Sequence, residues 1–129
     1  MILLDTHVIV WMNGNSRKLS RTALSAIRRS ERTDSLAISV ISLIELARLV
    51  ATNRIEPMGS IEQTLRKLVE GIPIVPITLE IAAHTTYFPP AFPSDPADRI
   101  IAATSRVEGL PLVTADERIL SCPLLETIW

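Results

Sequence analysis

A chain of 129 residues with a net charge of −1 has the size of one ordinary domain, so we expect a single domain over residues 1–129. Its composition, 47% hydrophobic and 21% charged, is sufficient for a buried core, and the lone Cys122 excludes an internal disulfide. The near-neutral charge argues against a protein that coats nucleic acid electrostatically. No apolar run approaches the ~18 residues needed to span a membrane, so we expect a cytoplasmic protein without a membrane contact.

Short apolar, β-rich runs alternate along the chain with longer segments of helical periodicity. Strands are expected at residues 2–4, 36–39, 74–77, 112–114 and 125–128. Helices are expected at residues 20–32, 42–52, 60–70, 78–86 and 96–108, with a helical turn at 116–120. Strands separated by helices imply right-handed crossovers and a parallel sheet covered by helices. The pattern therefore predicts an α/β fold.

Helix boundaries are marked by capping residues. Ser42 and Glu45 have the spacing of a capping box, which predicts that the second helix opens at Ser42. Ser60 has the position of an N-cap. Pro96 suits the first turn of the last long helix, and Gly109 follows its expected end.

Four carboxylates follow strands or begin helices at the same predicted edge of the sheet. Asp5 comes directly after the first strand, and Asp116 comes two residues after Thr114. Glu45 lies in the early turns of the helix after the second strand, and Asp98 lies in the first turn of the helix before the fourth. Functional groups of open α/β sheets gather beyond the carboxyl ends of the strands. We therefore expect these four acids to meet there.

Converging carboxylates beside apolar walls repel one another and stay ionised only if a cation compensates them. An all-oxygen set suits Mg²⁺ or Mn²⁺ better than zinc, and such ions commonly assist phosphodiester hydrolysis. Structural roles remain open for each acid. Asp5 could cap a helix, Glu45 could only complete the capping box, Asp98 could pair with Asp95 in another, and Asp116 could complement a helix dipole.

Four segments together resemble the PIN domain, and more narrowly the VapC toxins of bacterial type II toxin–antitoxin systems. They are Leu-Leu-Asp-Thr-His-Val-Ile-Val-Trp (3–11), Ser-Leu-Ile-Glu-Leu (42–46), Asp-Pro-Ala-Asp-Arg-Ile-Ile-Ala-Ala-Thr (95–104) and Leu-Val-Thr-Ala-Asp (112–116). The match spans nearly the whole chain, in order and at family-like spacing. One such fragment would be weak evidence, whereas four in register are specific.

The resemblance implies a three-layer α/β/α sandwich with a parallel sheet of about five strands. It also implies an endoribonuclease dependent on Mg²⁺ or Mn²⁺, usually a homodimer, in which water attacks the phosphorus in line. The residues matching the family's acidic positions are Asp5, Glu45, Asp98 and Asp116, taken as metal ligands with Glu45 as ligand or base. Thr6 and Thr114 match positions that often carry a hydroxyl group. Whether Asp95 contributes, and whether one or two ions act, stays open.

A VapC-like protein would act on RNA and would be inhibited by a cognate antitoxin, which commonly places a basic side chain in the acidic pocket. The alternative is a catalytically idle PIN-like module that binds RNA or protein. Intact carboxylates count against it, because an idle acidic pocket would repel RNA without benefit.

Several other side chains have two open interpretations. Six basic residues fall between positions 17 and 32, either as a solvated helix face or as a ridge that contacts phosphates. Arg99 could contact a substrate phosphate or pair with an acid. His7 could reach the site, although an isolated histidine is more often structural. Three aromatic residues in the proline-rich loop at 87–96 could stack on bases, line an interface or pack the loop. Trp11 is expected in the core or a dimer contact.

Overall fold

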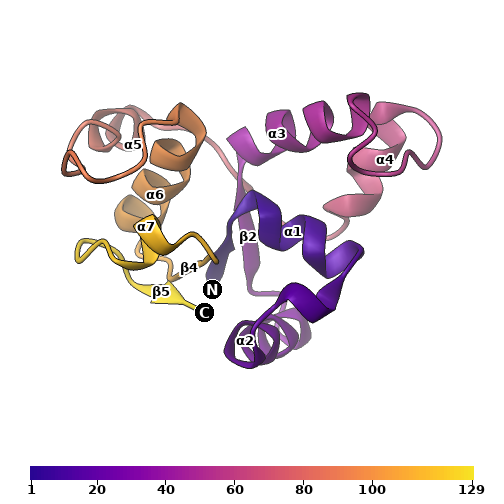
Figure 1. The fold of residues 1–129 in the computed structure, drawn as a ribbon, viewed down its shortest axis with the longest axis horizontal. Coiled ribbons are helices and arrows are strands. Elements are labelled where there is room, and N and C mark those ends of the chain that lie inside the picture. Colours follow the sequence, from indigo (N-terminus) through magenta and orange to yellow (C-terminus); the bar gives the residue numbers. More distant parts are fainter.

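The computed structural model describes all 129 residues and contains one five-stranded, fully parallel sheet with the order β3-β2-β1-β4-β5 (Figure 1). The strands are β1 (Ile2–Leu4), β2 (Leu36–Ser39), β3 (Ile74–Val75), β4 (Leu112–Val113) and β5 (Thr127–Ile128). The strands β2 and β3 are added on one side of β1, and β4 and β5 are then added on the other side. The predicted α/β fold with about five parallel strands is confirmed, and the reversal of strand order beside β1 is where such sheets form crevices.

Seven α-helices and one 3-10 helix connect the strands. They are α1 (Thr6–Asn13), η1 (Ser16–Lys18), α2 (Arg21–Arg32), α3 (Val40–Ala51), α4 (Ile61–Leu68), α5 (Leu79–His84), α6 (Pro96–Glu108) and α7 (Glu117–Leu120). None of them combines the length and the apolar character that crossing a membrane requires.

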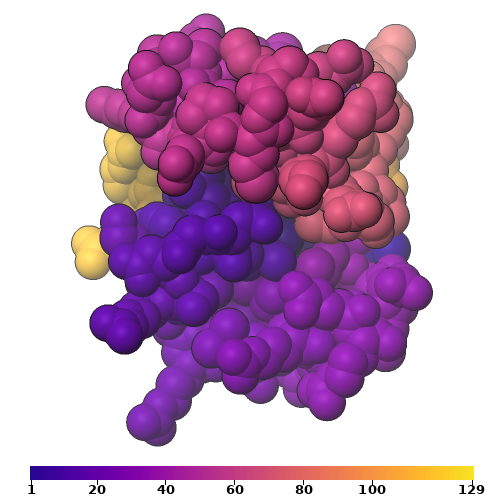
Figure 2. Space-filling view, turned by 90° about the vertical axis from the view of Figure 1, so that its right-hand side faces the viewer, coloured from indigo at the N-terminus to yellow at the C-terminus, as the bar shows by residue number.

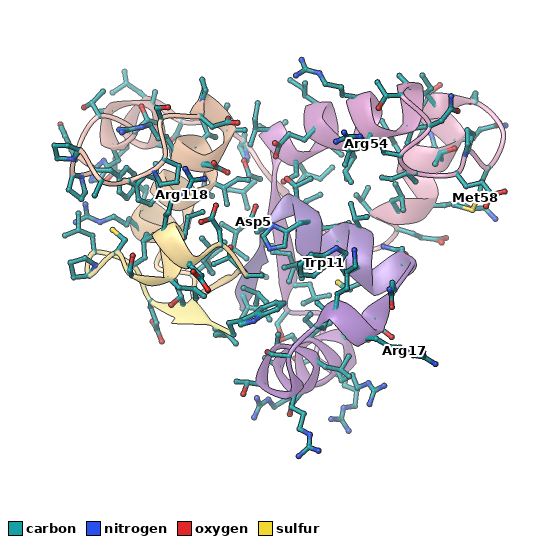
Figure 3. All side chains as sticks on the ribbon, in the orientation of Figure 1. Asp5, Trp11, Arg17, Arg54, Met58 and Arg118 are labelled. Carbon is teal, nitrogen blue, oxygen red and sulfur yellow. The ribbon has the colours of Figure 1, made fainter.

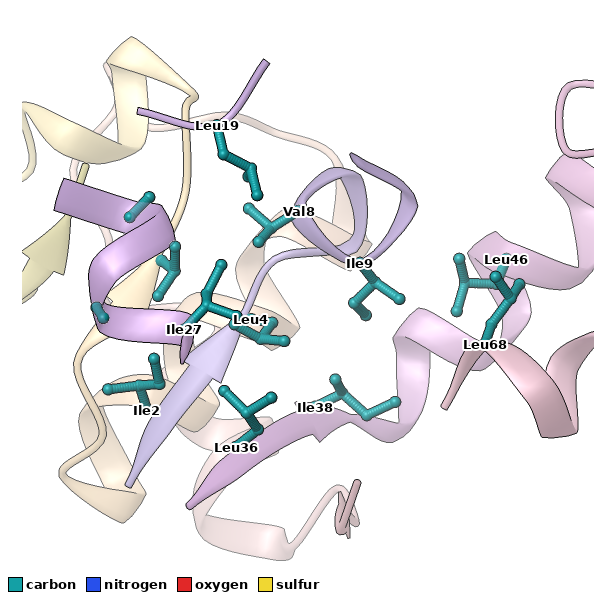
Figure 4. Packing of buried hydrophobic residues seen from close by; sticks show 13 residues of the cluster. Ile2, Leu4, Val8, Ile9, Leu19, Ile27, Leu36, Ile38, Leu46 and Leu68 are labelled. Atoms are coloured by element: carbon teal, nitrogen blue, oxygen red, sulfur yellow. The ribbon is translucent and has the colours of Figure 1, made fainter. Parts of the chain in front are cut away.

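Helices cover both faces of the sheet because alternate strand residues point to opposite sides. Ile2 and Leu4 face a core shared with the helices α1 to α4, and Figure 4 shows this packing around Leu4. Leu3 faces the other core, to which α5, α6 and α7 contribute. This arrangement confirms the three-layer architecture.

The turn η1 was not predicted, and the helix α1 was expected only as the open alternative in which Asp5 caps a helix. The run Val8-Ile9-Val10 is β-branched and has low intrinsic helix propensity. Asp5 nevertheless caps the helix through a bond to the Thr6 amide, and the fully buried Val8 and Ile9 pack into the core. Tertiary packing therefore outweighs local propensity here.

The start predicted for the helix α3 is wrong. Its N-cap is Ser39, whose hydroxyl accepts a bond from the Ile41 amide, so the helix begins at Val40 rather than Ser42. The start of α6 is as predicted, with Asp95 as its cap, and Gly109 ends it with a φ of 66° that favours glycine. The edge strands β3 and β5 are shorter than predicted, and Pro76, which has no amide donor, follows β3.

Candidate active site

Asp5 lies at the centre of the carboxyl edge of the sheet, between α6 and α7 on one side and α1 and α3 on the other (Figure 3). It is 4% exposed. Its Oδ1 accepts from the Thr6 amide at 2.8 Å, and its Oδ2 accepts from the Thr114 hydroxyl at 2.8 Å. His7 Nδ1 stands 3.7 Å from the same Oδ2. Capping and site membership are thus compatible roles for Asp5.

Glu45 is connected to α1 through Thr6. The Thr6 hydroxyl donates to Glu45 Oε1 at 2.5 Å, and Thr6 Oγ1 lies 2.9 Å from the Ser42 hydroxyl, which is fully buried. Ser42 and Glu45 therefore do not form the predicted capping box, because both side chains turn from their own helix toward α1. Burial raises the pKa of Glu45, the Thr6 hydrogen bond opposes this, and Asp5 raises the pKa further.

Asp98 is the acid whose ionisation is most disfavoured. It lies in the first turn of α6 and makes no side-chain hydrogen bond, since Asp95 alone caps the helix through the Ala97 amide at 2.8 Å. Burial raises the pKa of Asp98 to about 7, with further contributions from the charges of Asp5, Asp95, Asp116 and Glu45. The predicted convergence of acids therefore appears as a raised pKa of Asp98.

Asp116 reaches the site from the opposite side of β1. It caps α7 by accepting from the Arg118 amide at 2.9 Å, and it forms an exposed ion pair with the Arg118 side chain at 3.4 Å. Its own amide donates to Thr114 Oγ1 at 3.1 Å. Thr114 therefore connects Asp5 with Asp116 by two hydrogen bonds.

A pocket of about 340 Å³ opens beside these acids. It is lined by Asp5, Thr6, His7, Val10, Trp11, Glu45, Arg48, Leu49 and Asp98. Neither Trp11 nor Arg48 was predicted to lie here. Helical spacing could have placed them, because Trp11 is four residues from His7 and Arg48 three from Glu45, which puts each pair on one helix face. Arg48 forms no ion pair within 4.0 Å.

His7 forms part of the pocket wall with a defined orientation. Its Nε2 accepts from the Ala115 amide at 2.9 Å, which leaves the proton on Nδ1, the nitrogen facing Asp5. Its ring lies 4.9 Å from the Trp11 ring, centroid to centroid. His7 is thus positioned by backbone and aromatic contacts at the rim of the acidic pocket.

Arg99 is occupied elsewhere. Its Nε donates to the Pro93 carbonyl at 2.9 Å, and another guanidinium nitrogen donates to the Thr85 carbonyl at 3.1 Å. Its guanidinium carbon lies 5.8 Å from the Phe92 ring centroid. These contacts tie α6 to the proline-rich loop and argue against a substrate role for Arg99.

The aromatic residues of that loop pack mainly on each other. Phe88 and Phe92 are buried, with ring centroids 4.4 Å apart and nearly parallel planes. Tyr87 is exposed and contacts His84 edge to face. Loop packing therefore accounts for Phe88 and Phe92.

The donor chemistry of the site fits a hard divalent cation. Carboxylate and hydroxyl oxygens dominate it, and a cation bound between the acids would relieve the mutual repulsion that raises the pKa of Asp98. No three His, Cys, Asp or Glu side chains stand as close together as the ligands of one ion in this structure. Binding would therefore require side-chain rotations that draw the carboxylates inward.

The fold and the site define an α/β domain with an acidic pocket at its topological switch point. Comparison with known families matches residues 2–122 to the PIN domain, and the chain belongs to this family. It is 40% identical to Ribonuclease VapC22 of Mycobacterium tuberculosis over 130 residues, which cover 99% of this chain and 98% of that protein.

Solved structures share the fold at low sequence identity. DNA-bound VapBC from Salmonella typhimurium matches with a TM-score of 0.74 and 19% identity, covering 98% of this chain and 97% of that one. VapBC2 from Rickettsia felis, bound to a DNA fragment from its promoter, has a TM-score of 0.73, 18% identity and the same coverages. FitAcB from Neisseria gonorrhoeae has a TM-score of 0.68 and 23% identity, covering 98% and 96%.

Proposed function

We propose that this protein is an endoribonuclease that depends on Mg²⁺ or Mn²⁺ and acts as the toxin of a toxin–antitoxin pair. The observation that carries the proposal is the pocket lined by Asp5, Glu45 and Asp98, with Asp116 close enough to raise the pKa of Asp98. The likeness to a protein named as a ribonuclease over nearly the full chain supports the reaction class.

In this proposal Asp5, Asp98 and Asp116 hold the cation, with Glu45 as a further ligand or as the base. The bound cation would activate water and neutralise charge on the phosphoryl oxygens. Thr114 fixes Asp5 Oδ2, and Thr6 occupies Glu45 Oε1. Glu45 Oε2 is then left to accept a proton from the attacking water.

The test is cleavage of a mixed pool of structured RNAs by purified protein without antitoxin, in Mg²⁺, Mn²⁺ or EDTA. Asp5→Asn and Asp98→Asn remove ligands, whereas Glu56→Gln removes an exposed acid outside the pocket and serves as the matched control. We expect discrete cuts that require metal, vanish in both Asn variants and persist in the control. Cuts that persist in the Asn variants would contradict the site, and a folded protein that neither cuts RNA nor binds Mn²⁺ would contradict the function.

Protein partners are part of the same proposal. One solved structure with this fold is described as a toxin–antitoxin complex, and another as a member of a family of toxin–antitoxin systems. Ile44, Met58 and Ile61 expose apolar surface around α3 and α4 that suits a protein partner. A cytoplasmic location would follow from an RNA substrate. The measurement is inhibition of cleavage by the antitoxin encoded beside this chain; full cleavage in the presence of bound antitoxin would contradict this role.

A homodimer is supported by a second apolar group on the segment 74–87. Leu79 is 89% exposed, and Ile74, Ile77 and Tyr87 are exposed nearby. Light scattering of the isolated protein should report twice the 14.2 kDa mass, and Leu79→Glu should return it to the mass of one chain. A wild-type protein that stays a monomer at all concentrations would contradict this assignment.

A further inference from the structure

The positive charge of this protein is concentrated in one segment. Residues 17–32 contain six of the 13 basic residues and one acid, so this segment carries +5 and the remainder −6, which together give the net −1. All six basic side chains are exposed, and none forms an ion pair within 4.0 Å. Nitrogen-tipped side chains extend from this part of the molecule, with Arg17 pointing outward (Figure 3).

Three of these side chains form a line along α2, here called the arginine stripe: Arg21, Arg28 and Arg32. Their spacing of seven and eleven residues places them on one face of the helix. The buried residues of α2, such as Ala26 and Ile27, lie on the opposite face. The stripe therefore points directly away from the core and extends for about 16 Å at 1.5 Å per residue.

The stripe is connected to the acidic pocket through Trp11 and Lys18. Trp11 lines the pocket together with Asp5, and Lys18 Nζ lies 5.6 Å from the Trp11 ring centroid. Lys18 is the last residue of η1, and Arg21 opens α2 three residues later. Figure 2 shows α1 and η1 (indigo) between the α3–α4 region (magenta to pink) above and α2 (purple) below.

The hollow on the other side of α1 lacks this charge bias. It has a volume of about 620 Å³, and its charged lining consists of Arg54 and Lys67 with Glu56 and Glu70. Opposite charges in equal number give no net attraction for a polyanion. Lys18 and the three arginines of the stripe therefore make the surface that leads away from Trp11 electropositive.

We propose that the RNA strand flanking the scissile phosphate leaves the pocket across Trp11 and Lys18 and continues along the arginine stripe of α2. Trp11, a partly exposed aromatic residue of the pocket wall, would stack on an unpaired base once Lys18 moves to a phosphate, and the stripe would contact successive phosphates. This inference rests on the proposed ribonuclease function. It also explains how a chain with a net negative charge and an acidic site attracts RNA, because six of its 13 basic residues are concentrated in residues 17–32.

The decisive measurement is RNA affinity as a function of salt. Fluorescence anisotropy would follow a labelled single-stranded RNA of mixed sequence, bound to protein carrying Asp98→Asn to prevent cleavage. Arg28→Gln with Arg32→Gln tests the stripe, and Arg66→Gln with Arg106→Gln is the control with the same charge change elsewhere. Loss of two phosphate contacts should lower the salt slope by about 1.4 and the affinity about tenfold near physiological salt.

A second measurement tests the passage across Trp11. Cleavage kinetics of otherwise wild-type protein should show a raised KM for the stripe variant and for Trp11→Leu, whereas Trp11→Phe, which keeps an aromatic ring, should raise KM less than Trp11→Leu does. Trp11 packs against the core and lies 5.9 Å from Trp129, so thermal unfolding must accompany each Trp11 variant. A KM unchanged in a folded Trp11→Leu protein would overturn the passage across Trp11.

The two proposals fail in different ways. Equal affinity and salt slope for stripe and control variants would overturn the RNA track and assign the stripe to an acidic protein partner, while metal-dependent cleavage by wild-type protein would still support the nuclease. Loss of affinity in the stripe variant alone would support the track even if wild-type protein cuts no RNA, in which case only the nuclease proposal fails.

Discussion

Replacing Asp98 by asparagine should stabilise the folded protein in EDTA while abolishing the proposed cleavage. The folded state raises the pKa of Asp98 from 3.8 to about 7. Between these values the folded chain holds a proton that the unfolded chain has lost. Stability therefore decreases as pH rises through this window, and the penalty is fully present above pH 7. The amide of the Asp98→Asn variant carries no charge and escapes this penalty.

The size of the effect follows from the shift. About three pKa units at 1.36 kcal/mol each give an upper limit of about 4 kcal/mol. Asp98 is only half-buried and faces the open pocket, so solvent screening reduces this to about 1–2 kcal/mol. The lost charge in the first turn of α6 opposes the gain by about 0.3–1 kcal/mol. The relief from desolvation is larger than the lost helix-dipole interaction, so we expect Asp98→Asn to raise the free energy of unfolding by about 1 kcal/mol.

The assay is thermal unfolding in EDTA at a series of pH values, with Glu56→Gln as the control for loss of one negative charge. At pH 8 Asp98→Asn should melt roughly 4 °C above wild type, and the difference should vanish as the pH falls toward 4. Mg²⁺ should raise the Tm of wild type and not that of the variant. An Asp98→Asn protein that is no more stable than wild type in EDTA at pH 8 would refute the reasoning.

Three further predictions concern a hydrogen bond of the site, a helix cap and the packing of the core. Thr6→Val removes the hydrogen bond that lowers the pKa of Glu45, so the acid limb of the pH–rate profile should move to higher pH. Thr6→Ser keeps the hydroxyl group and should leave the acid limb where it is in wild type. An acid limb that does not move in Thr6→Val would contradict a role for Glu45 as base. Ser60→Ala removes the cap of α4 and should cost about 1 kcal/mol in urea unfolding, with cleavage unchanged. Ile101→Ala empties a fully buried position of α6 and should cost roughly 2–5 kcal/mol; a loss below about 1 kcal/mol would contradict tight packing there.

Capping and turn residues in the sequence predict helix boundaries correctly where tertiary packing favours the same boundaries. The helix α6 could be predicted at both ends because Pro96 and Gly109 have conformational preferences that few residues share. The helix α3 was misplaced because Ser39 and Ser42 are both good caps by sequence. Only the fold shows that Ser42 instead meets Thr6, 36 residues away in the chain.

The acids of the site could be predicted as a set because each follows a strand or opens a helix at the same edge. Their individual environments could not. The bond from Thr114 to Asp5 joins residues 109 positions apart, and the raised pKa of Asp98 depends on burial and on four other carboxylates. The contacts that engage Arg99 are carbonyl groups of an irregular loop, which leave no pattern in the sequence.

The bond between Thr114 and Asp5 joins residues 109 positions apart within one side-chain cluster. Asp5 is synthesised before α6, β4 and Asp116. A growing chain therefore first carries only Asp5, Thr6 and Glu45, joined by the Thr6 hydrogen bond. At that stage β1 has not yet paired with β4. The site becomes complete only once Asp98 and Asp116 have been synthesised, so that a growing chain that stops before α6 has Asp5 and Glu45 without Asp98 and Asp116.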